Sequence, residues 1–241
     1  MLWLHVDPVP DAGDFALIGS EEARHALGAR RLAPGDEVTL FDGRGGVATA
    51  RLSGERGRGG EMRVDVTERR DAAPLQPEVT IAFAVPKGDR LSTLLELATQ
   101  AGASRLVPIA CARSVVDAEK PGRGARWTRI VAESAKVAKS AWMPELLPGG
   151  ALLEVARAEA ARGAALAVAH VGSSEPILRW SRERAPDAAR TVFIGPEGGF
   201  DEREIAALLS LGAAAVSLGP LVMRVELAAV AATLFLRGTA D

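Results

Sequence analysis

The sequence predicts an α/β protein with a mostly parallel sheet, preceded by a smaller β-rich domain. Three observations support this. From residue 79 onward, apolar runs of strand length alternate with segments of helical spacing, as in parallel α/β sheets. Before that, short segments alternate apolar and polar residues, as half-buried strands do. Pro74 and Pro77 mark a linker between the two kinds of pattern.

The first domain is expected to span residues 1–72. A short helix is predicted to begin at Ser20, whose side chain is the expected N-cap. The dipeptide Asp42-Gly43 is a strong hairpin turn signal. Strands are predicted on both sides of this turn and beyond it, at residues 37–41, 46–52 and 61–66. These elements predict a small barrel-like β domain.

The second domain is expected to span residues 73–241. The run at 79–85 is apolar throughout, which is typical of a strand buried on both faces of a parallel sheet. Further strands are predicted at residues 105–110, 165–170, 190–194 and 214–218. Helices are predicted at about residues 89–101, 126–141, 202–211 and 225–237. Strand and helix therefore alternate along most of this domain.

The composition narrows the functional class. Of the 241 residues, 48% are hydrophobic and 25% are charged, which is typical of a folded globular protein. No apolar run approaches the roughly 20 residues of a membrane span, and the first residues do not resemble a signal peptide. The single cysteine, Cys111, excludes an intramolecular disulfide. We therefore expect a cytoplasmic protein without a membrane partner.

Two loops follow predicted strands and carry the chemistry. Ligands of open α/β sheets bind at the carboxyl ends of strands, so loops in this position are candidate binding sites. The loop at 194–200 (IGPEGGF) has three glycines, which let a backbone approach a ligand closely. The loop at 218–226 (LGPLVMRVE) is apolar, with one arginine and one glutamate. Neither is a dinucleotide or nucleoside triphosphate fingerprint, which disfavours a nicotinamide-dependent oxidoreductase.

Positive charge gathers in the middle of the chain. Residues 85–140 contain ten basic and five acidic side chains, a net charge of +5, whereas the whole chain has a net charge of −2. A local basic zone of this kind is typical of a surface that contacts RNA phosphates. The expected RNA-binding residues are Arg24, Arg30, Arg31, Lys87, Arg90, Arg113, Lys136 and Lys139.

The two loop motifs, separated by about 20 residues, resemble the signature of the ribosomal small-subunit RNA methyltransferase E family. Shorter similarities extend the resemblance over nearly the whole chain, among them residues 86–90 (PKGDR) and 141–145 (AWMPE). Proteins of this family have an N-terminal PUA-like domain and a SPOUT domain with a deep trefoil knot. They methylate N3 of a uridine in 16S rRNA, and their target is uridine 1498.

The resemblance implies S-adenosylmethionine (SAM) as cofactor, held mainly by backbone groups of three loops. On the matching positions, the cofactor residues are Ala169, His170, Val171, Gly172, Ile194, Gly195, Pro196, Glu197, Gly198, Gly199, Leu218, Gly219, Leu221, Val222 and Met223. Arg224 is the candidate cation that stabilises charge on the target base, and Glu226 either orients Arg224 or accepts the proton. The resemblance also implies a homodimer that acts on 16S rRNA or the assembled small subunit.

The chain departs from the family pattern at polar positions. Leu4 lies in a stretch where the family carries an arginine, Val137 and Ser140 replace polar residues of the central helix, and Leu227 replaces a threonine. The alternative function is therefore a SAM- or RNA-binding paralogue with altered or lost methyltransferase activity. No cluster of His, Cys and Asp has metal-ligand spacing, so no metal is expected.

Overall fold

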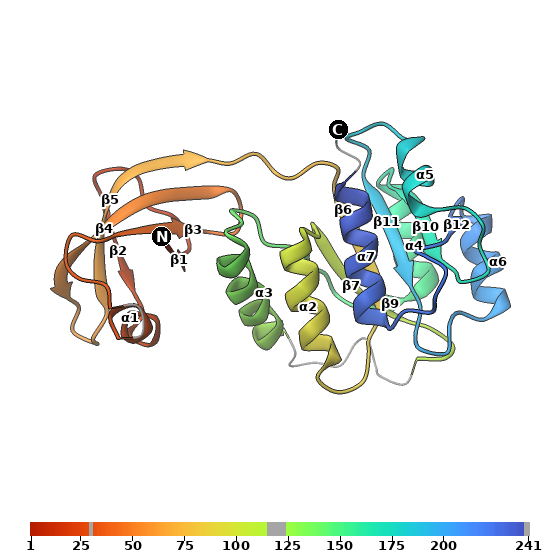
Figure 1. The fold of residues 1–241 in the computed structure, drawn as a ribbon, viewed down its shortest axis with the longest axis horizontal. Helices are drawn as coiled ribbons and strands as arrows, with labels where there is room; N and C mark the ends of the chain where they lie inside the picture. The colour runs from red at the N-terminus through yellow and green to blue at the C-terminus, as the bar shows by residue number, and fades with distance from the viewer. Residues whose placement is uncertain (29–30, 115–123, 239–241) are drawn as a thin grey trace. The chain divides into compact units, whose positions relative to one another are not determined.

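The structure is a computed structural model that describes residues 1–28, 31–114 and 124–238. The chain forms two compact units (Figure 1). Unit 1 comprises Met1–Pro74 and Ala135–Met143, and unit 2 comprises Leu75–Ser134 and Pro144–Asp241.

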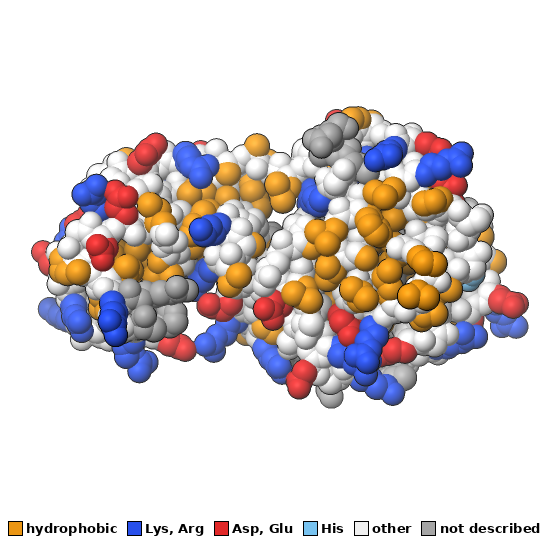
Figure 2. All heavy atoms as spheres, viewed as in Figure 1, with side chains coloured by type: hydrophobic (Ala, Val, Ile, Leu, Met, Phe, Trp, Pro, Cys, Tyr) orange, Lys and Arg blue, Asp and Glu red, His pale blue; other side chains and the backbone are white. Residues whose placement is uncertain are grey.

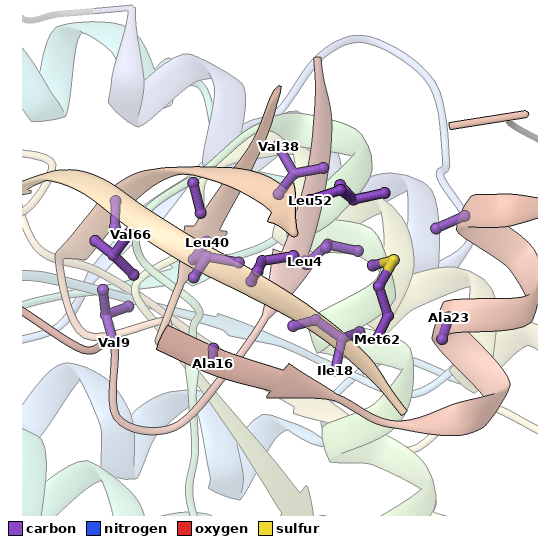
Figure 3. Packing of buried hydrophobic residues seen from close by; sticks show 14 residues of the cluster. Leu4, Val9, Ala16, Ile18, Ala23, Val38, Leu40, Leu52, Met62 and Val66 are labelled. Atoms are coloured by element: carbon purple, nitrogen blue, oxygen red, sulfur yellow. The ribbon is translucent and has the colours of Figure 1, made fainter. Parts of the chain in front are cut away.

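Unit 1 is built on a five-stranded sheet. In spatial order its strands are β1 (Leu2–His5), β3 (Glu37–Phe41), β4 (Gly46–Arg56), β5 (Met62–Asp71) and β2 (Phe15–Ile18). The pair β1–β3 is parallel, and the other pairs are antiparallel. Alternate side chains point to one face, where Leu4, Leu40 and Val66 pack in the buried core (Figure 3). The predicted hairpin at Asp42-Gly43 and the buried face of the third predicted strand are both confirmed.

The short helix α1 (Ser20–Leu27) forms where it was predicted, but its N-cap was predicted wrongly. Gly19 is the N-cap, and no side chain caps the helix. Ser20 lies inside the first turn, where Glu21 and Glu22 favour the positive end of the helix dipole. Strands β1 and β2 were not predicted, because a run of four residues carries too little alternation to be distinguished from a loop.

Residues Ala135–Met143 belong to unit 1 although they follow most of helix α3 (Gly124–Ala138) in the chain. The indole Nε1 of Trp142 donates a hydrogen bond of 2.9 Å to the carbonyl oxygen of Ala72. The backbone N–H of Met143 donates to Gly43 O over 2.9 Å. Residues 135–143 are thus a second chain segment of unit 1. The domain boundary predicted after residue 72 assumed that each domain is one continuous stretch of the chain.

Unit 2 contains a seven-stranded sheet in which every described strand pair is parallel, as predicted. In spatial order its strands are β12 (Ala214–Val216), β10 (Ala165–Ala169), β11 (Arg190–Ile194), β6 (Val79–Ala84), β7 (Arg105–Ala110) and β8 (Glu145–Leu146), while β9 (Gly150–Ala151) also pairs with β7. All six residues of β6 are buried, as its apolar sequence predicts.

Helices cover both faces of this sheet (Figure 1). They are α2 (Arg90–Ala101), α4 (Leu152–Ala161), α5 (Ile177–Arg182), α6 (Glu202–Ser210) and α7 (Val225–Arg237). Helix α7 packs on α2 and on the central strands, and α4 packs on β10, β7 and α6. The predicted α/β class with a parallel sheet is confirmed, and the trefoil knot stays a prediction. No helix in the described ranges is long and apolar enough to cross a bilayer.

Candidate functional site

A cavity of about 390 Å³ lies at the carboxyl ends of β10, β11 and β12. These three strands are neighbours in the sheet, so the loops that follow them meet at one edge. Ligands bind at this edge in open α/β sheets because the strand-to-helix loops leave backbone groups there without sheet partners. The predicted location of the site at the carboxyl ends of strands therefore coincides with the cavity.

Fourteen of the fifteen residues predicted for the cofactor line this cavity. They are Ala169, His170, Val171, Ile194, Gly195, Pro196, Glu197, Gly198, Gly199, Leu218, Gly219, Leu221, Val222 and Met223. Sequence reasoning missed four further lining residues, which are Phe200, Ser217, Val225 and Ala228. Val225 and Ala228 lie three apart on α7, and this helical spacing beside the second motif could have identified them.

The loop after β11 has a conformation that only glycine takes easily. Gly199 has a φ of +68°, and its N–H donates a hydrogen bond of 2.8 Å to Pro196 O, which closes a tight turn. A Cβ atom on Gly195 would lie 3.0 Å from the ring of Phe200. Gly198 differs, because a Cβ atom there would meet only the Arg113 side chain, at 3.4 Å. Gly199 is thus favoured by its backbone conformation, and Gly195 by its close contact with the Phe200 ring.

The loop after β12 contributes most of the apolar lining. Ser217 Oγ accepts a hydrogen bond of 3.2 Å from the N–H of Gly219, which has a φ of +151°. Leu221 and Val222 line the cavity yet are both 77% exposed. A ligand that covers these exposed side chains removes apolar surface from water, which is favourable in free energy. This loop can therefore supply binding energy to an apolar group.

His170 holds the shape of the third loop. Its Nδ1 accepts a hydrogen bond of 3.2 Å from the N–H of Gly172. A Cβ atom on Gly172 would lie 2.9 Å from the imidazole Cε1. Gly172 is the one predicted cofactor residue that does not line the cavity, and its place explains why. It packs against the histidine ring rather than facing the ligand space.

Two arginines predicted to bind RNA contact the glycine-rich loop instead of standing apart from it. Arg113 Nη1 donates a hydrogen bond of 2.6 Å to Gly198 O. Arg90 Nη1 lies 3.1 Å from Glu197 Oε1, and both side chains of this ion pair are more than 40% exposed. Exposed ion pairs are worth about 0–1 kcal/mol, so the bond of Arg113 to the backbone is the stronger support.

Helix α6 begins directly after this loop and fixes its far end. Asp201 Oδ1 accepts from the N–H of Glu204, and Glu204 Oε2 accepts from the N–H of Asp201, which is a complete capping box. Glu204 Oε1 also accepts a 2.7 Å hydrogen bond from Ala112 N. Burial, together with the charge of Glu204, raises the pKa of the Cys111 thiol to about 12. Cys111 is thus a neutral structural residue beside the site.

Arg224 and Glu226, the predicted catalytic residues, lie at the start of α7. Arg224 is its N-cap and is exposed, and its two neighbours in the chain, Met223 and Val225, line the cavity. Glu226 Oε2 is buried without a hydrogen-bond partner in the described part of the chain. The described residues show no hydrogen bond between Arg224 and Glu226 Oε2. A polar atom buried in this way costs about 1–3 kcal/mol unless a partner or water reaches it.

The other predicted RNA-binding residues are distributed over both units. Arg24, Arg31, Lys87 and Lys139 are exposed. Lys136 Nζ forms an ion pair with Glu22, and its side chain is only 15% exposed. Arg30 lies outside the described residues. No group of three or more His, Cys, Asp or Glu side chains within 1–28, 31–114 and 124–238 could hold a metal ion.

Comparison with known proteins identifies the family. A family profile described as an RNA methyltransferase domain matches residues 73–237, and one described as an RNA methyltransferase PUA domain matches residues 17–60. The chain is 36% identical over 234 residues to "Ribosomal RNA small subunit methyltransferase E" of Mycobacterium tuberculosis, which covers 95% of this chain and 88% of that protein. The chain belongs to the ribosomal RNA small subunit methyltransferase E family. The resemblance carried by the two loop motifs is thereby confirmed.

Solved structures agree with this family. The ribosomal RNA small subunit methyltransferase E of Neisseria gonorrhoeae, solved bound to S-adenosyl methionine, is 26% identical, with a TM-score of 0.83 over 97% of this chain and 95% of that one. A probable rRNA-methyltransferase from Porphyromonas gingivalis, at 24% identity and a TM-score of 0.84, covers 99% of this chain and 98% of its own and shares the fold. The methyltransferase E family fold thus extends over both units.

Proposed function

We propose that the cavity at the carboxyl ends of β10, β11 and β12 binds SAM. Its volume of about 390 Å³ lies in the range of roughly 300–1,000 Å³ that small-molecule sites occupy. Its lining combines glycine backbone with apolar side chains, which suits a ligand with an apolar ring and a polar tail. The structure of the Neisseria gonorrhoeae relative, solved with S-adenosyl methionine, supports the same ligand for this chain.

Each loop has a part in holding the cofactor. Leu221 and Val222 would cover the apolar ring and thioether region. The backbone of residues 195–199 would hydrogen-bond the polar groups, because its glycines leave the N–H and C=O groups accessible. His170 and Gly172 would keep the loop after β10 in shape. When bound, SAM supplies a methyl group activated by its sulfonium.

The reaction we propose is methylation of N3 of a uridine in 16S rRNA, at position 1498. The N3 proton must leave as the new N–C bond forms and the S–CH₃ bond breaks, so the site needs a proton acceptor and a cation. Arg224 would stabilise negative charge on the uracil carbonyl oxygens through its guanidinium fork. Glu226 Oε2 has no partner within the described ranges and can accept a proton, which favours the acceptor role over orienting Arg224.

RNA would be held by exposed basic side chains on both units. Arg24, Arg31, Lys87 and Lys139 are accessible and remain in this proposal, together with Arg30. Arg90 and Arg113 contact the cofactor loop, so they would touch RNA only at the rim of the site. Lys136 is engaged by Glu22, which makes it the weakest of the predicted phosphate contacts. The substrate would be 16S rRNA or the assembled small subunit, in the cytoplasm.

The protein would act as a homodimer built on unit 2. Apolar side chains gather on the surface over α7 and its neighbours (Figure 2). Leu227 and Leu234 of α7 are 54% and 53% exposed, and Leu97 of α2, which packs on α7, is 39% exposed. Contiguous exposed apolar patches on soluble proteins mark interaction surfaces. Light scattering should therefore give twice the 25.2 kDa chain mass at micromolar concentration, and a single-chain mass would reject the dimer.

The function is tested by mass-mapping modified uridines in 16S rRNA from cells with and without the gene. The proposal predicts one N3-methyluridine that disappears with the gene and returns when purified protein and SAM are added to the unmodified subunit. The alternative, a paralogue without activity, predicts SAM binding but the same uridine map in both strains. Free 16S rRNA and assembled subunits assayed side by side identify which of them is the substrate.

A further inference from the structure

The sheet of unit 1 has a second face whose residues the proposed reaction does not use. Leu4 and Leu40 point into the core (Figure 3), so their chain neighbours Trp3 and Thr39 lie on the opposite face. The strand registers extend this arrangement across the sheet. Trp3 of β1 is opposite Thr39 of β3, Thr39 is opposite Thr49 of β4, and Thr49 is opposite Glu68 of β5. Four strands thus contribute one row of side chains.

This row borders a cavity of about 220 Å³, whose lining is completed by Met1, Val47 and Arg70. Thr39 Oγ1 donates a hydrogen bond of 3.0 Å to Met1 Sδ. Val47 and Arg70 are opposite each other in the β4–β5 register, one row further along the same face. The volume lies below the roughly 300–1,000 Å³ of sites for drug-sized ligands, so the cavity suits one small planar group. All its lining residues belong to unit 1.

The two charged side chains of the cavity, Glu68 and Arg70, have no partner in the described part of the chain. Several neighbouring charged residues of this sheet are paired: Arg51 contacts Glu37, and Arg69 contacts Asp11 and Asp71. The side chains of Glu68 and Arg70 are exposed and make no ion pair or hydrogen bond within residues 1–28, 31–114 and 124–238. A carboxylate that only accepts and a guanidinium that only donates therefore remain available at one small site.

The aromatic wall of the cavity is held in place before any ligand arrives. The Trp3 ring packs on Phe41 at a centroid distance of 5.5 Å, tilted by 54°. Phe41 is fully buried, and β1 pairs with β3 along all four of its residues. An indole fixed in this way loses little side-chain freedom on binding, and aromatic side chains of RNA-binding proteins stack on unpaired bases.

We propose that this cavity binds one unpaired guanine base of the RNA substrate. Trp3 would stack on the base, Glu68 would accept hydrogen bonds from its N1–H and N2–H groups, and Arg70 would donate to O6 or N7. Guanine fits better than adenine or uracil because it presents two adjacent donors to a carboxylate and two adjacent acceptors to an arginine. The inference depends on the proposed function only in taking RNA as the substrate.

The test measures binding of short fluorescent uridine oligomers that carry one central guanine, adenine or cytosine, by anisotropy at one fixed salt concentration. The full-length protein should bind the guanine oligomer about tenfold more tightly than the others. Trp3→Leu should weaken that binding at least fivefold, since stacking contributes about 1–3 kcal/mol per base. Trp3→Phe should retain most of it, because the phenyl ring also stacks.

Two further variants change exposed side chains, so they should not affect folding. Glu68→Gln should abolish the preference for guanine, while the oligomers with a central adenine or cytosine bind as before. Arg58→Gln, which removes an exposed arginine outside the cavity, should leave the preference intact. SAM affinity, measured by calorimetry, should be the same in all variants. A wild-type protein without guanine preference, or a preference that survives both Trp3→Leu and Glu68→Gln, would overturn the proposal.

The readouts also separate this inference from the proposed reaction. Guanine preference without methyl transfer would reject the uridine chemistry and support the base-binding site. Methyl transfer to 16S rRNA without guanine preference would reject the site and support the chemistry.

Discussion

The two edges of the parallel sheet in unit 2 are built in opposite ways. At the edge where the strands begin, charged side chains form hydrogen bonds and ion pairs with one another around the buried Glu159. Its Oε1 accepts from Arg105 Nη1 over 2.8 Å, and its Oε2 accepts from Arg162 Nε over 2.9 Å and from Thr191 Oγ1 over 2.7 Å. At the carboxyl end, glycine-rich loops and exposed apolar side chains surround an open cavity.

The same contrast holds for the chain segments that close each edge. Arg237, at the end of α7, donates to Gly102 O and to Ser104 Oγ, so it ties the helix to the amino edge. Arg224, at the start of the same helix, is exposed beside the cavity. Helix α7 therefore connects the two edges of the sheet. Side-chain hydrogen bonds fix its last turn at the amino edge, and its first turn lies beside the loops of the carboxyl edge. Substitutions at the two edges should separate stability from function.

The largest expected effect is on stability, from Glu159→Gln. Removing one partner of a buried charge network typically costs 3–5 kcal/mol, and we expect about 3 kcal/mol because Arg162 keeps some access to solvent. Chemical denaturation measures this loss of unfolding free energy. Glu154→Gln, an exposed change on the same helix, should have almost no effect. SAM affinity of the folded Glu159→Gln protein should not change, and a weakened affinity would contradict the separation of the edges.

The same residue predicts a pH dependence. Burial alone would raise the pKa of Glu159, but hydrogen bonds from Thr191 and Arg162 and the charges of Arg105 and Arg162 outweigh burial and lower it. A carboxyl with a lowered folded-state pKa stabilises the protein above its unfolded pKa of about 4.3, and this contribution disappears as the pH falls further. Unfolding free energy should therefore fall below about pH 4 more steeply in the wild type than in Glu159→Gln. Equal slopes would exclude Glu159 as the source.

The next effect is on rate, from Arg224→Ala. If its guanidinium stabilises charge on the target base, methyl transfer should fall by about a hundredfold or more, while SAM affinity and stability stay the same. Arg203→Ala removes another exposed arginine, in the first turn of α6, and should leave the rate unchanged. Single-turnover transfer to unmodified subunits measures both variants. A normal rate for Arg224→Ala would remove it from the reaction.

A smaller effect concerns the support of the glycine-rich loop. Arg113→Ala loses a hydrogen bond to Gly198 O, worth about 1 kcal/mol, so SAM should bind about fivefold more weakly. Arg90→Ala removes only an exposed ion pair with Glu197, and its affinity should change less than twofold. If both variants bound SAM as tightly as the wild type, the loop would be rigid without either arginine.

Long periodic elements and loop positions could be predicted from the sequence, because both follow local rules. The bounds predicted for the helix at 225–237 match α7, since its apolar residues recur over more than three turns. Helix α4 and the two-residue strands β8 and β9 were missed: the alanine-rich α4 has no clear apolar stripe, and two residues carry no pattern.

Contacts between distant parts of the chain could not be predicted in the same way. Arg113 and Gly198 are 85 positions apart, and Arg90 and Glu197 are 107 apart. Side-chain type suggested phosphate binding for both arginines, and only the fold brings them to the loop. The ion pair of Lys136 with Glu22 spans 114 positions and escaped prediction for the same reason.

The central claim is that the open carboxyl edge binds SAM, and calorimetric titration of the cofactor tests it most directly. Leu221→Asp places a charge in the cavity lining, whereas Leu209→Asp makes the same change on the exposed side of α6, outside the lining. We predict one SAM bound per chain in the wild type and in Leu209→Asp, and binding at least tenfold weaker in Leu221→Asp, a difference of about 1.4 kcal/mol. Absence of SAM binding in the wild type, or equal affinity in the two variants, would contradict the account.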